Sequence, residues 1–163
     1  MLDVGSGTGI LCAGFYEMVR SDPPLKETQV VGIEHIDALA QSSVQNLSKS
    51  YSQELQNGNI RIVCGDGRQG YPDLAPYDGI HVGAGTPQVP KALIDQLKVG
   101  GKLVIPVGPD GNQHIFVFKK EDNKGNITQF RSIGVCYVSL TSREKQCPDL
   151  YAGRSVPKPR ARK

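Results

Sequence analysis

Three glycines and three acidic residues have the types and spacing of a ligand-binding site. The loop Gly5-Ser6-Gly7-Thr8-Gly9 follows a short apolar run that contains Asp3. Glu34 and Asp66 each follow a further apolar run. Glycines allow the backbone to turn tightly, often at positive φ, and to approach a ligand that a Cβ would keep away. Carboxylates accept hydrogen bonds from hydroxyl and amino groups. The pattern therefore predicts backbone amides and acids gathered around a polar ligand.

The spacing of the glycines distinguishes two classes of nucleotide-like ligand. A dinucleotide fold has G-x-G-x-x-G, with the pyrophosphate seated at a helix N-terminus. In this chain the last glycine of that pattern is replaced by Ile10, so the loop reads G-x-G-x-G. That spacing is typical of methyltransferases that use S-adenosyl-L-methionine (AdoMet). Taken alone, the loop also fits a strand-to-helix turn with no ligand.

Apolar runs and helical spacings alternate along the first two thirds of the chain. Strands are expected at 2–4, 30–33, 60–64, 77–84 and 102–107. Helices are expected at 10–19, at 37–55 with Asp37 as N-cap and Val44 on the apolar face, and from Pro90 to a stop at 99–101. This alternation of strands and helices requires a parallel sheet with right-handed crossovers.

The last third predicts a different connection. Apolar stretches at 114–119 and 130–138 are separated by a polar turn at 121–126 with no helix between them, which is a hairpin signal. One antiparallel hairpin added to five parallel strands is the class I AdoMet-dependent methyltransferase fold. We therefore expect a Rossmann-like α/β domain with a mostly parallel seven-stranded sheet, an antiparallel C-terminal hairpin and helices on both faces.

In an open parallel sheet, ligands lie across the carboxyl ends of the strands, so the three acids should meet at one crevice. Asp3 and the glycine loop suit the methionine part of AdoMet. Glu34 can accept both ribose hydroxyls, and Asp66 with Gly67 can bind the adenine edge. Each acid by itself also fits a helix cap or a solvated loop charge.

Composition limits the remaining possibilities. A chain of 163 residues with 38% hydrophobic residues and a net charge of +3 suits a single soluble domain, expected over 1–150, followed by a basic, disordered tail at 151–163. Nothing indicates nucleic acid, a membrane or a metal site. Four dispersed cysteines favour reduced thiols in the cytoplasm, with Cys12, Cys64 and Cys136 buried. We expect a monomer.

Several longer strings resemble the protein-L-isoaspartate O-methyltransferase family. They are Leu2 to Leu11, Val31 to Ile36, Gly65 to Tyr71, Ala75 to Ala84, Val89 to Lys98, Gly100 to Gly108 and Val135 to Thr141. The strings within 65–84 and 89–108 are the most particular, and the resemblance extends to about Gln146. It implies methyl transfer from AdoMet to the α-carboxylate of L-isoaspartyl or D-aspartyl residues in damaged proteins. The products are S-adenosyl-L-homocysteine (AdoHcy) and an ester that closes to a succinimide on the way back to aspartate.

The resemblance also implies a set of cofactor contacts, in which Thr141 and Gln146 close over the ligand from the C-terminal side. The set is Asp3, Gly5, Ser6, Gly7, Glu34, His35, Asp66, Gly67, Thr141 and Gln146. His35 and His81 follow apolar strands, and a hydrogen-bonded near-core role is favoured over a catalytic one for each.

One departure from the family limits the expected activity. The family carries, before its first strand, a motif of the type Thr-Ile-Ser-Ala-Pro-His whose serine is assigned to the active site, and this motif does not occur in the chain. We therefore assign no catalytic residue and expect a cofactor crevice with weakened AdoMet affinity and little or no turnover. The alternatives are another class I methyltransferase and a non-catalytic module that binds AdoMet or a partner. A dinucleotide-dependent oxidoreductase is disfavoured by Ile10 and by the hairpin.

Overall fold

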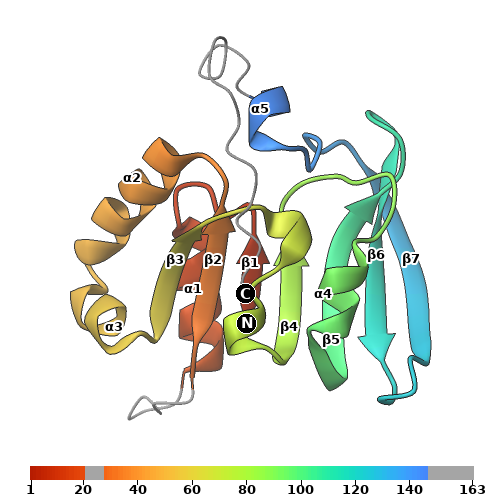
Figure 1. The fold of residues 1–163 in the computed structure, drawn as a ribbon, viewed down its shortest axis with the longest axis horizontal. Coiled ribbons are helices and arrows are strands. Elements are labelled where there is room, and N and C mark those ends of the chain that lie inside the picture. The colour runs from red at the N-terminus through yellow and green to blue at the C-terminus, as the bar shows by residue number, and fades with distance from the viewer. Residues whose placement is uncertain (21–27, 147–163) are drawn as a thin grey trace, which may run out of the picture.

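The fold is built on one mixed sheet. The computed structural model describes residues 1–20 and 28–146, and these form a seven-stranded sheet with the order β3-β2-β1-β4-β5-β6-β7 (Figure 1). The strands are β1 (Leu2–Val4), β2 (Val30–Glu34), β3 (Ile60–Cys64), β4 (Tyr77–Val82), β5 (Leu97–Val107), β6 (Gln113–Lys120) and β7 (Ile127–Val135).

Strand direction confirms the expected fold class. β1 pairs in parallel with β2 on one side and β4 on the other, and β3 and β5 continue the parallel arrangement outward. β6 and β7 are antiparallel to their neighbours, so the C-terminal hairpin is present. The central strand β1 therefore ends beside the ends of β2 and β4, at the point where the strand order reverses. This is where an open sheet of this type binds its ligand.

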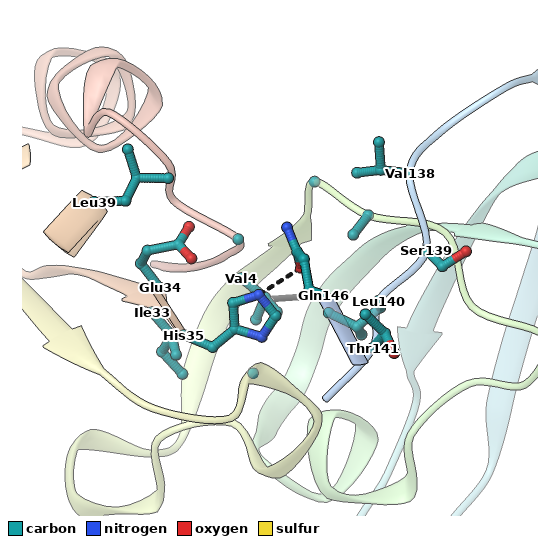
Figure 2. Close-up of a pocket in the computed structure, with 14 residues that line it drawn as sticks. Val4, Ile33, Glu34, His35, Leu39, Val138, Ser139, Leu140, Thr141 and Gln146 are labelled. Atoms are coloured by element: carbon teal, nitrogen blue, oxygen red, sulfur yellow. Dashed lines mark hydrogen bonds between the residues drawn. The ribbon is translucent and has the colours of Figure 1, made fainter. Parts of the chain in front are cut away.

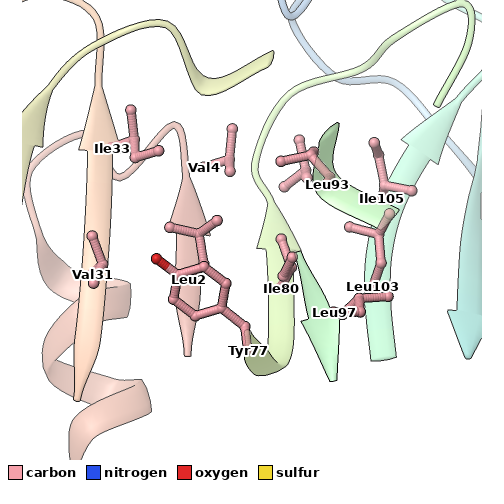
Figure 3. Packing of buried hydrophobic residues seen from close by; sticks show 11 residues of the cluster. Leu2, Val4, Val31, Ile33, Tyr77, Ile80, Leu93, Leu97, Leu103 and Ile105 are labelled. Atoms are coloured by element: carbon pink, nitrogen blue, oxygen red, sulfur yellow. The ribbon is translucent and has the colours of Figure 1, made fainter. Parts of the chain in front are cut away.

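Helices cover both faces of the sheet, and a last short helix, α5 (Arg143–Gln146), lies above the ends of the strands (Figure 1). The others are α1 (Ile10–Val19), α2 (Asp37–Ser48), α3 (Ser52–Asn57) and α4 (Lys91–Asp95), with short 3₁₀ turns η1 (Gly67–Gln69) and η2 (Pro72–Leu74). Successive strand residues point to opposite faces. Accordingly, Val30 belongs to one buried cluster with Cys12 and Tyr16 of α1. Val31 belongs to the other, which extends across the sheet to Leu93 of α4 (Figure 3).

The region after β2 differs from the expected single helix over 37–55. α2 ends at Ser48, and α3 begins after Tyr51, which has left the helical region at φ −130° and ψ 35°. Ser48 Oγ donates to the carbonyl of Gln45, a local hydrogen bond that makes serine a weak helix former. The N-cap is Ile36, with Asp37 in the first turn, and Val44 is 39% exposed, so both expectations for these residues are wrong.

Three further expectations need correction. β5 starts at Leu97 and so includes the segment 99–101 that was expected to end the preceding helix, while β7 covers 127–135 in place of 130–138. Cys12 is buried as expected, but Cys64 and Cys136 are exposed. Cys64 ends the edge strand β3, which has a neighbour on one side only. Cys147 and the basic tail lie outside the described residues. Among the helices described, none is long and apolar enough to cross a membrane.

Candidate functional site

A crevice lies across the carboxyl ends of the central strands and encloses about 120 Å³. Figure 2 shows side chains from the β1 and β2 ends facing a segment that precedes α5. The lining residues are Val4, Gly5, Ile33, Glu34, His35, Leu39, Gly67, Gly83, Ala84, Val138, Ser139, Leu140, Thr141 and Gln146. The lining thus combines backbone-exposing glycines, apolar side chains and a few polar groups.

The glycine loop adopts the conformation that the sequence predicts and reaches the crevice through Gly5. Gly5, Gly7 and Gly9 have φ values of 80°, 56° and 86°, a region that other residues rarely adopt. The amides of Gly5 and Ser6 both donate to the carbonyl of Ile33, which joins the loop to β2. Each glycine of the G-x-G-x-G pattern is therefore required by the path of the backbone itself.

Glu34 is buried at the end of β2, with 6% of its surface exposed, and its carboxylate is fixed on both sides. Oε2 accepts a hydrogen bond from the Gly7 amide at 3.1 Å, and Oε1 accepts one from the Ile36 amide at 2.9 Å. A carboxylate has about four acceptor positions. Two amide contacts therefore orient the group and leave acceptor capacity that faces the crevice.

Asp3 lies on the opposite face of β1 from the crevice lining and is fully buried. His81 Nδ1 is 2.7 Å from Asp3 Oδ1, and the Cys12 thiol donates to Oδ2 at 3.5 Å. The His81 ring also makes an edge contact with Phe15, with centroids 5.5 Å apart. His81 is thus a hydrogen-bonded histidine at the edge of the core, whereas the half-buried His35 lines the crevice.

The loop after β3 brings Gly67 to the crevice and turns Asp66 toward Arg68. Asp66 accepts the Arg68 guanidinium through both carboxylate oxygens and the Arg68 amide at 3.0 Å. These hydrogen bonds from Arg68 hold the pKa of Asp66 below its usual value. Gly67 is buried, and a Cβ there would overlap the side chain of Val4. Only a glycine fits this wall without displacing β1.

The segment that follows the hairpin, Val138 to Gln146, forms the wall of the crevice opposite the β1 and β2 ends (Figure 2). The Gly85 amide donates to the carbonyl of Val138 at 2.7 Å, and the Leu140 amide donates to the carbonyl of Gly85 at 2.6 Å. Farther along, Gln146 Oε1 is 2.6 Å from His35 Nε2, the contact drawn dashed in Figure 2. The segment therefore spans the crevice from the β4 end to the β2 end.

The structure brings six of the ten sequence-predicted contact residues to the crevice lining: Gly5, Glu34, His35, Gly67, Thr141 and Gln146. It places Asp3 and Ser6 in the interior, commits the Gly7 amide to Glu34 and pairs Asp66 with Arg68. Sequence reasoning missed the remaining lining residues, which are Val4, Ile33, Leu39, Gly83, Ala84, Val138, Ser139 and Leu140. Gly83 and Ala84 carried a signal, because they form the exit of an apolar strand.

Comparison with known proteins gives a consistent family. The family model described as protein-L-isoaspartate(D-aspartate) O-methyltransferase matches residues 1–145. Protein-L-isoaspartate O-methyltransferase 1 of Arabidopsis thaliana is 48% identical over 147 residues, which are 90% of this chain and 61% of the plant protein. The Caenorhabditis elegans enzyme is also 48% identical, over 89% of this chain and 62% of its own length. The chain thus spans about three fifths of these relatives.

Two solved structures have the same fold. A Plasmodium falciparum protein described as a protein-L-isoaspartate O-methyltransferase, in complex with AdoHcy, superposes with a TM-score of 0.72 at 29% identity, over 87% of this chain and 65% of that one. Another structure of the same name gives a TM-score of 0.70 at 28% identity, over 85% of this chain and 40% of that one.

Proposed function

Since the chain belongs to the protein-L-isoaspartate(D-aspartate) O-methyltransferase family, we propose that it binds AdoMet in the crevice and that its reaction is methylation of isoaspartyl carboxylates, with the low turnover expected from the sequence. The acceptor is the α-carboxylate of L-isoaspartyl, and of D-aspartyl, residues in damaged proteins, and the role is protein repair. The observation that carries the proposal is the buried Glu34 carboxylate, oriented by two amides at the rim of a glycine cradle.

The residues present fit an adenosyl ligand. Gly5, Gly67 and Gly83 bring bare backbone to the crevice, and a Cβ at Gly83 would come within 3.3 Å of the Gly5 carbonyl oxygen. Glu34 keeps acceptor positions for a pair of ribose hydroxyls, and Leu39 and Leu140 offer apolar contact on either side. We propose direct contacts from Gly5, Glu34, His35, Gly67, Thr141 and Gln146, with Asp3, Ser6, Gly7 and Asp66 shaping the loops behind them.

The proposed reaction makes few chemical demands on the protein. AdoMet supplies a methyl group on a sulfonium, which is already electrophilic. The α-carboxylate acceptor is ionised at neutral pH, so no proton has to be removed before attack. The chain must instead hold donor and acceptor in line and keep competing water away. The rigid loop ends of β1, β2 and β4 are suited to this positioning role.

We also propose that residues 1–150 act as one AdoMet-binding domain, as a monomer, in the cytoplasm. The family match over 1–145 and the single sheet shared by both buried clusters support one domain. Within residues 1–20 and 28–146, no disulfide joins the dispersed cysteines Cys12, Cys64 and Cys136 to one another, and this favours a reducing compartment.

The test is methyl transfer from radiolabelled AdoMet to a peptide that contains one isoaspartyl residue. The matched control is the same peptide with normal aspartate, and AdoHcy is added as a competitor. Incorporation into the isoaspartyl peptide alone, suppressed by AdoHcy, supports the proposal. AdoHcy binding without incorporation favours the non-catalytic module, and equal labelling of both peptides favours a methyltransferase with another substrate.

A further inference from the structure

We propose that Gln113 is a positioning residue for the crevice, because its side-chain amide fixes the strap, residues 137–141, that forms one wall. The inference rests on the proposed function, since it concerns the geometry of the same cofactor site. Gln113 is the first residue of β6 and is 1% exposed. Burying a primary amide is costly unless its donor and acceptor groups are both used. Both hydrogen bonds of the Gln113 side-chain amide are made with the backbone of one residue, Tyr137.

The contact is two-pronged. Gln113 Nε2 donates to the carbonyl of Tyr137 at 3.2 Å, and Gln113 Oε1 accepts from the amide of Tyr137 at 2.8 Å. The side chain therefore satisfies both backbone groups of Tyr137, as a neighbouring strand would. β7 ends at Val135, so the chain has just left the sheet at this point. Gln113 supplies the hydrogen bonds that the sheet no longer provides.

The strap enters the crevice directly after this fixed point. Residues 138–141 all line it, and the two hydrogen bonds with Gly85 hold them against the β4 end. Gly85 is also what makes room for the glutamine, since a Cβ there would lie 2.6 Å from Gln113 Nε2. Gln113, Gly85 and the strap thus pack together. The side-chain amide of Gln113 determines the position of the strap at the crevice.

The same device occurs on the other side of the crevice. Gln96, 9% exposed, donates through Nε2 to the carbonyl of Gln69 at 2.8 Å and accepts through Oε1 from the amide of Tyr71 at 2.8 Å. This holds the loop that presents Gly67 to the crevice. Gly70, at φ 62°, leaves space for the side chain, and a Cβ there would overlap it. Two buried glutamines therefore fix two separate crevice walls.

The experiment uses the full chain and four variants. Gln113→Met keeps the volume and removes both hydrogen bonds, Gln113→Glu keeps an acceptor for the Tyr137 amide, and Gln129→Met changes an exposed glutamine on β7 as a matched control. Ile60→Ala, in the other buried cluster, serves as a control for general loss of stability. Native-state hydrogen exchange at the amides of Gly85, Tyr137 and Leu140 is measured together with AdoHcy affinity.

We expect Gln113→Met to speed exchange at the three amides and to weaken AdoHcy binding, each by about tenfold, the loss of two ordinary hydrogen bonds. Amides of β1 and β2 keep their exchange rates, Gln113→Glu gives intermediate values, and both control variants bind as the unchanged chain does. If Gln113→Met does not fold, Gln113→Glu carries the comparison.

Unchanged exchange in the strap would overturn the proposal, as would faster exchange with full AdoHcy affinity. The proposal would also be overturned if Ile60→Ala weakened AdoHcy binding as much as Gln113→Met does, because a general loss of stability would then explain the effect. If the unchanged chain does not bind AdoHcy, the proposed function fails, and strap exchange alone decides whether Gln113 fixes this wall.

Discussion

His81 Nδ1 lies 2.7 Å from Asp3 Oδ1, which links the central strand β1 to β4 through a carboxylate with no exposed surface. The two residues face each other in the parallel pairing of these strands. The Cys12 thiol of α1 reaches the second oxygen. Asp3 of β1 therefore connects β4 and α1, directly before the glycine loop. These contacts hold the strand and the helix on either side of that loop in place.

Replacing His81 should destabilise the protein, because it leaves the buried Asp3 carboxylate without its histidine partner. We expect His81→Ala to lower the free energy of unfolding by about 3 kcal/mol, because a buried carboxylate loses its main partner. His81→Asn places an amide donor near the Nδ1 position and should recover part of that loss. Urea unfolding of the two variants measures the difference. Equal stability of the alanine variant and the unchanged chain would mean that the contact contributes nothing.

Cys12 should be unreactive in the folded protein. It is buried, and burial together with the neighbouring Asp3 carboxylate raises the pKa of its thiol well above the usual range. Because the thiolate is the reactive form, we expect iodoacetamide at pH 8 to modify Cys64 and Cys136 and to reach Cys12 only on unfolding. Peptide mass spectrometry measures each site. Modification of Cys12 as fast as Cys136 under native conditions would refute this.

Two glycine substitutions should act in opposite directions. A Cβ at Gly32 would lie 2.6 Å from Cys12 Sγ and 2.8 Å from Ser6 Cβ, so Gly32→Ala should destabilise the protein by about 1–3 kcal/mol through overpacking. Gly14 lies in α1 with nothing within 4 Å of its Cβ position, and Gly14→Ala should stabilise by about 0.5–1 kcal/mol. Thermal unfolding of both variants checks the signs. A stabilising Gly32→Ala would show that α1 packs differently.

The Asp66–Arg68 pair should make stability depend on pH at the acidic end. Arg68 lowers the pKa of Asp66 in the folded protein, so the pair stabilises the fold above the usual carboxyl pKa. That contribution is lost as the pH falls through the lowered pKa of the folded state. Both side chains are about two fifths exposed, so the effect is small.

The check compares the unchanged chain with Asp66→Asn between pH 2 and pH 7, with Asp73→Asn as a charge-matched control. The stability difference produced by Asp66→Asn should be steady near neutral pH and shrink toward pH 2. A difference that grows on acidification would reverse the assigned sign.

Sequence reasoning succeeded where a local pattern has one structural solution. The glycines at 5, 7 and 9 needed positive φ, and the two apolar stretches joined by a polar turn needed an antiparallel hairpin. It failed where the outcome depends on which strands become neighbours. Nothing local to Asp3 shows that His81 will stand opposite it. No local pattern marks Gln96 or Gln113 as a buried residue, and their contacts with Tyr71 and Tyr137 arise only once the sheet has formed.

The helix after β2 illustrates a different limit. Apolar residues continue at helical spacing from Ala40 to Leu55, but α2 ends at Ser48 and a separate helix, α3, begins at Ser52. A periodic pattern identifies the buried face and does not reveal whether the backbone runs through without a break. The exposure of Cys64 follows from β3 being an edge strand, which is a property of the sheet order and not of the strand's own residues.

Calorimetric titration with AdoHcy and with NAD tests the central claim, that the crevice at Glu34 binds an adenosyl ligand. We expect AdoHcy to bind and NAD not to bind. Glu34→Ala should weaken AdoHcy binding by about 1–3 kcal/mol, on the order of 10- to 100-fold in affinity. Glu17→Ala, on the exposed side of α1, should leave the affinity unchanged. Circular dichroism confirms that both variants are folded. Undiminished AdoHcy affinity in folded Glu34→Ala, or preferential binding of NAD, would contradict the account.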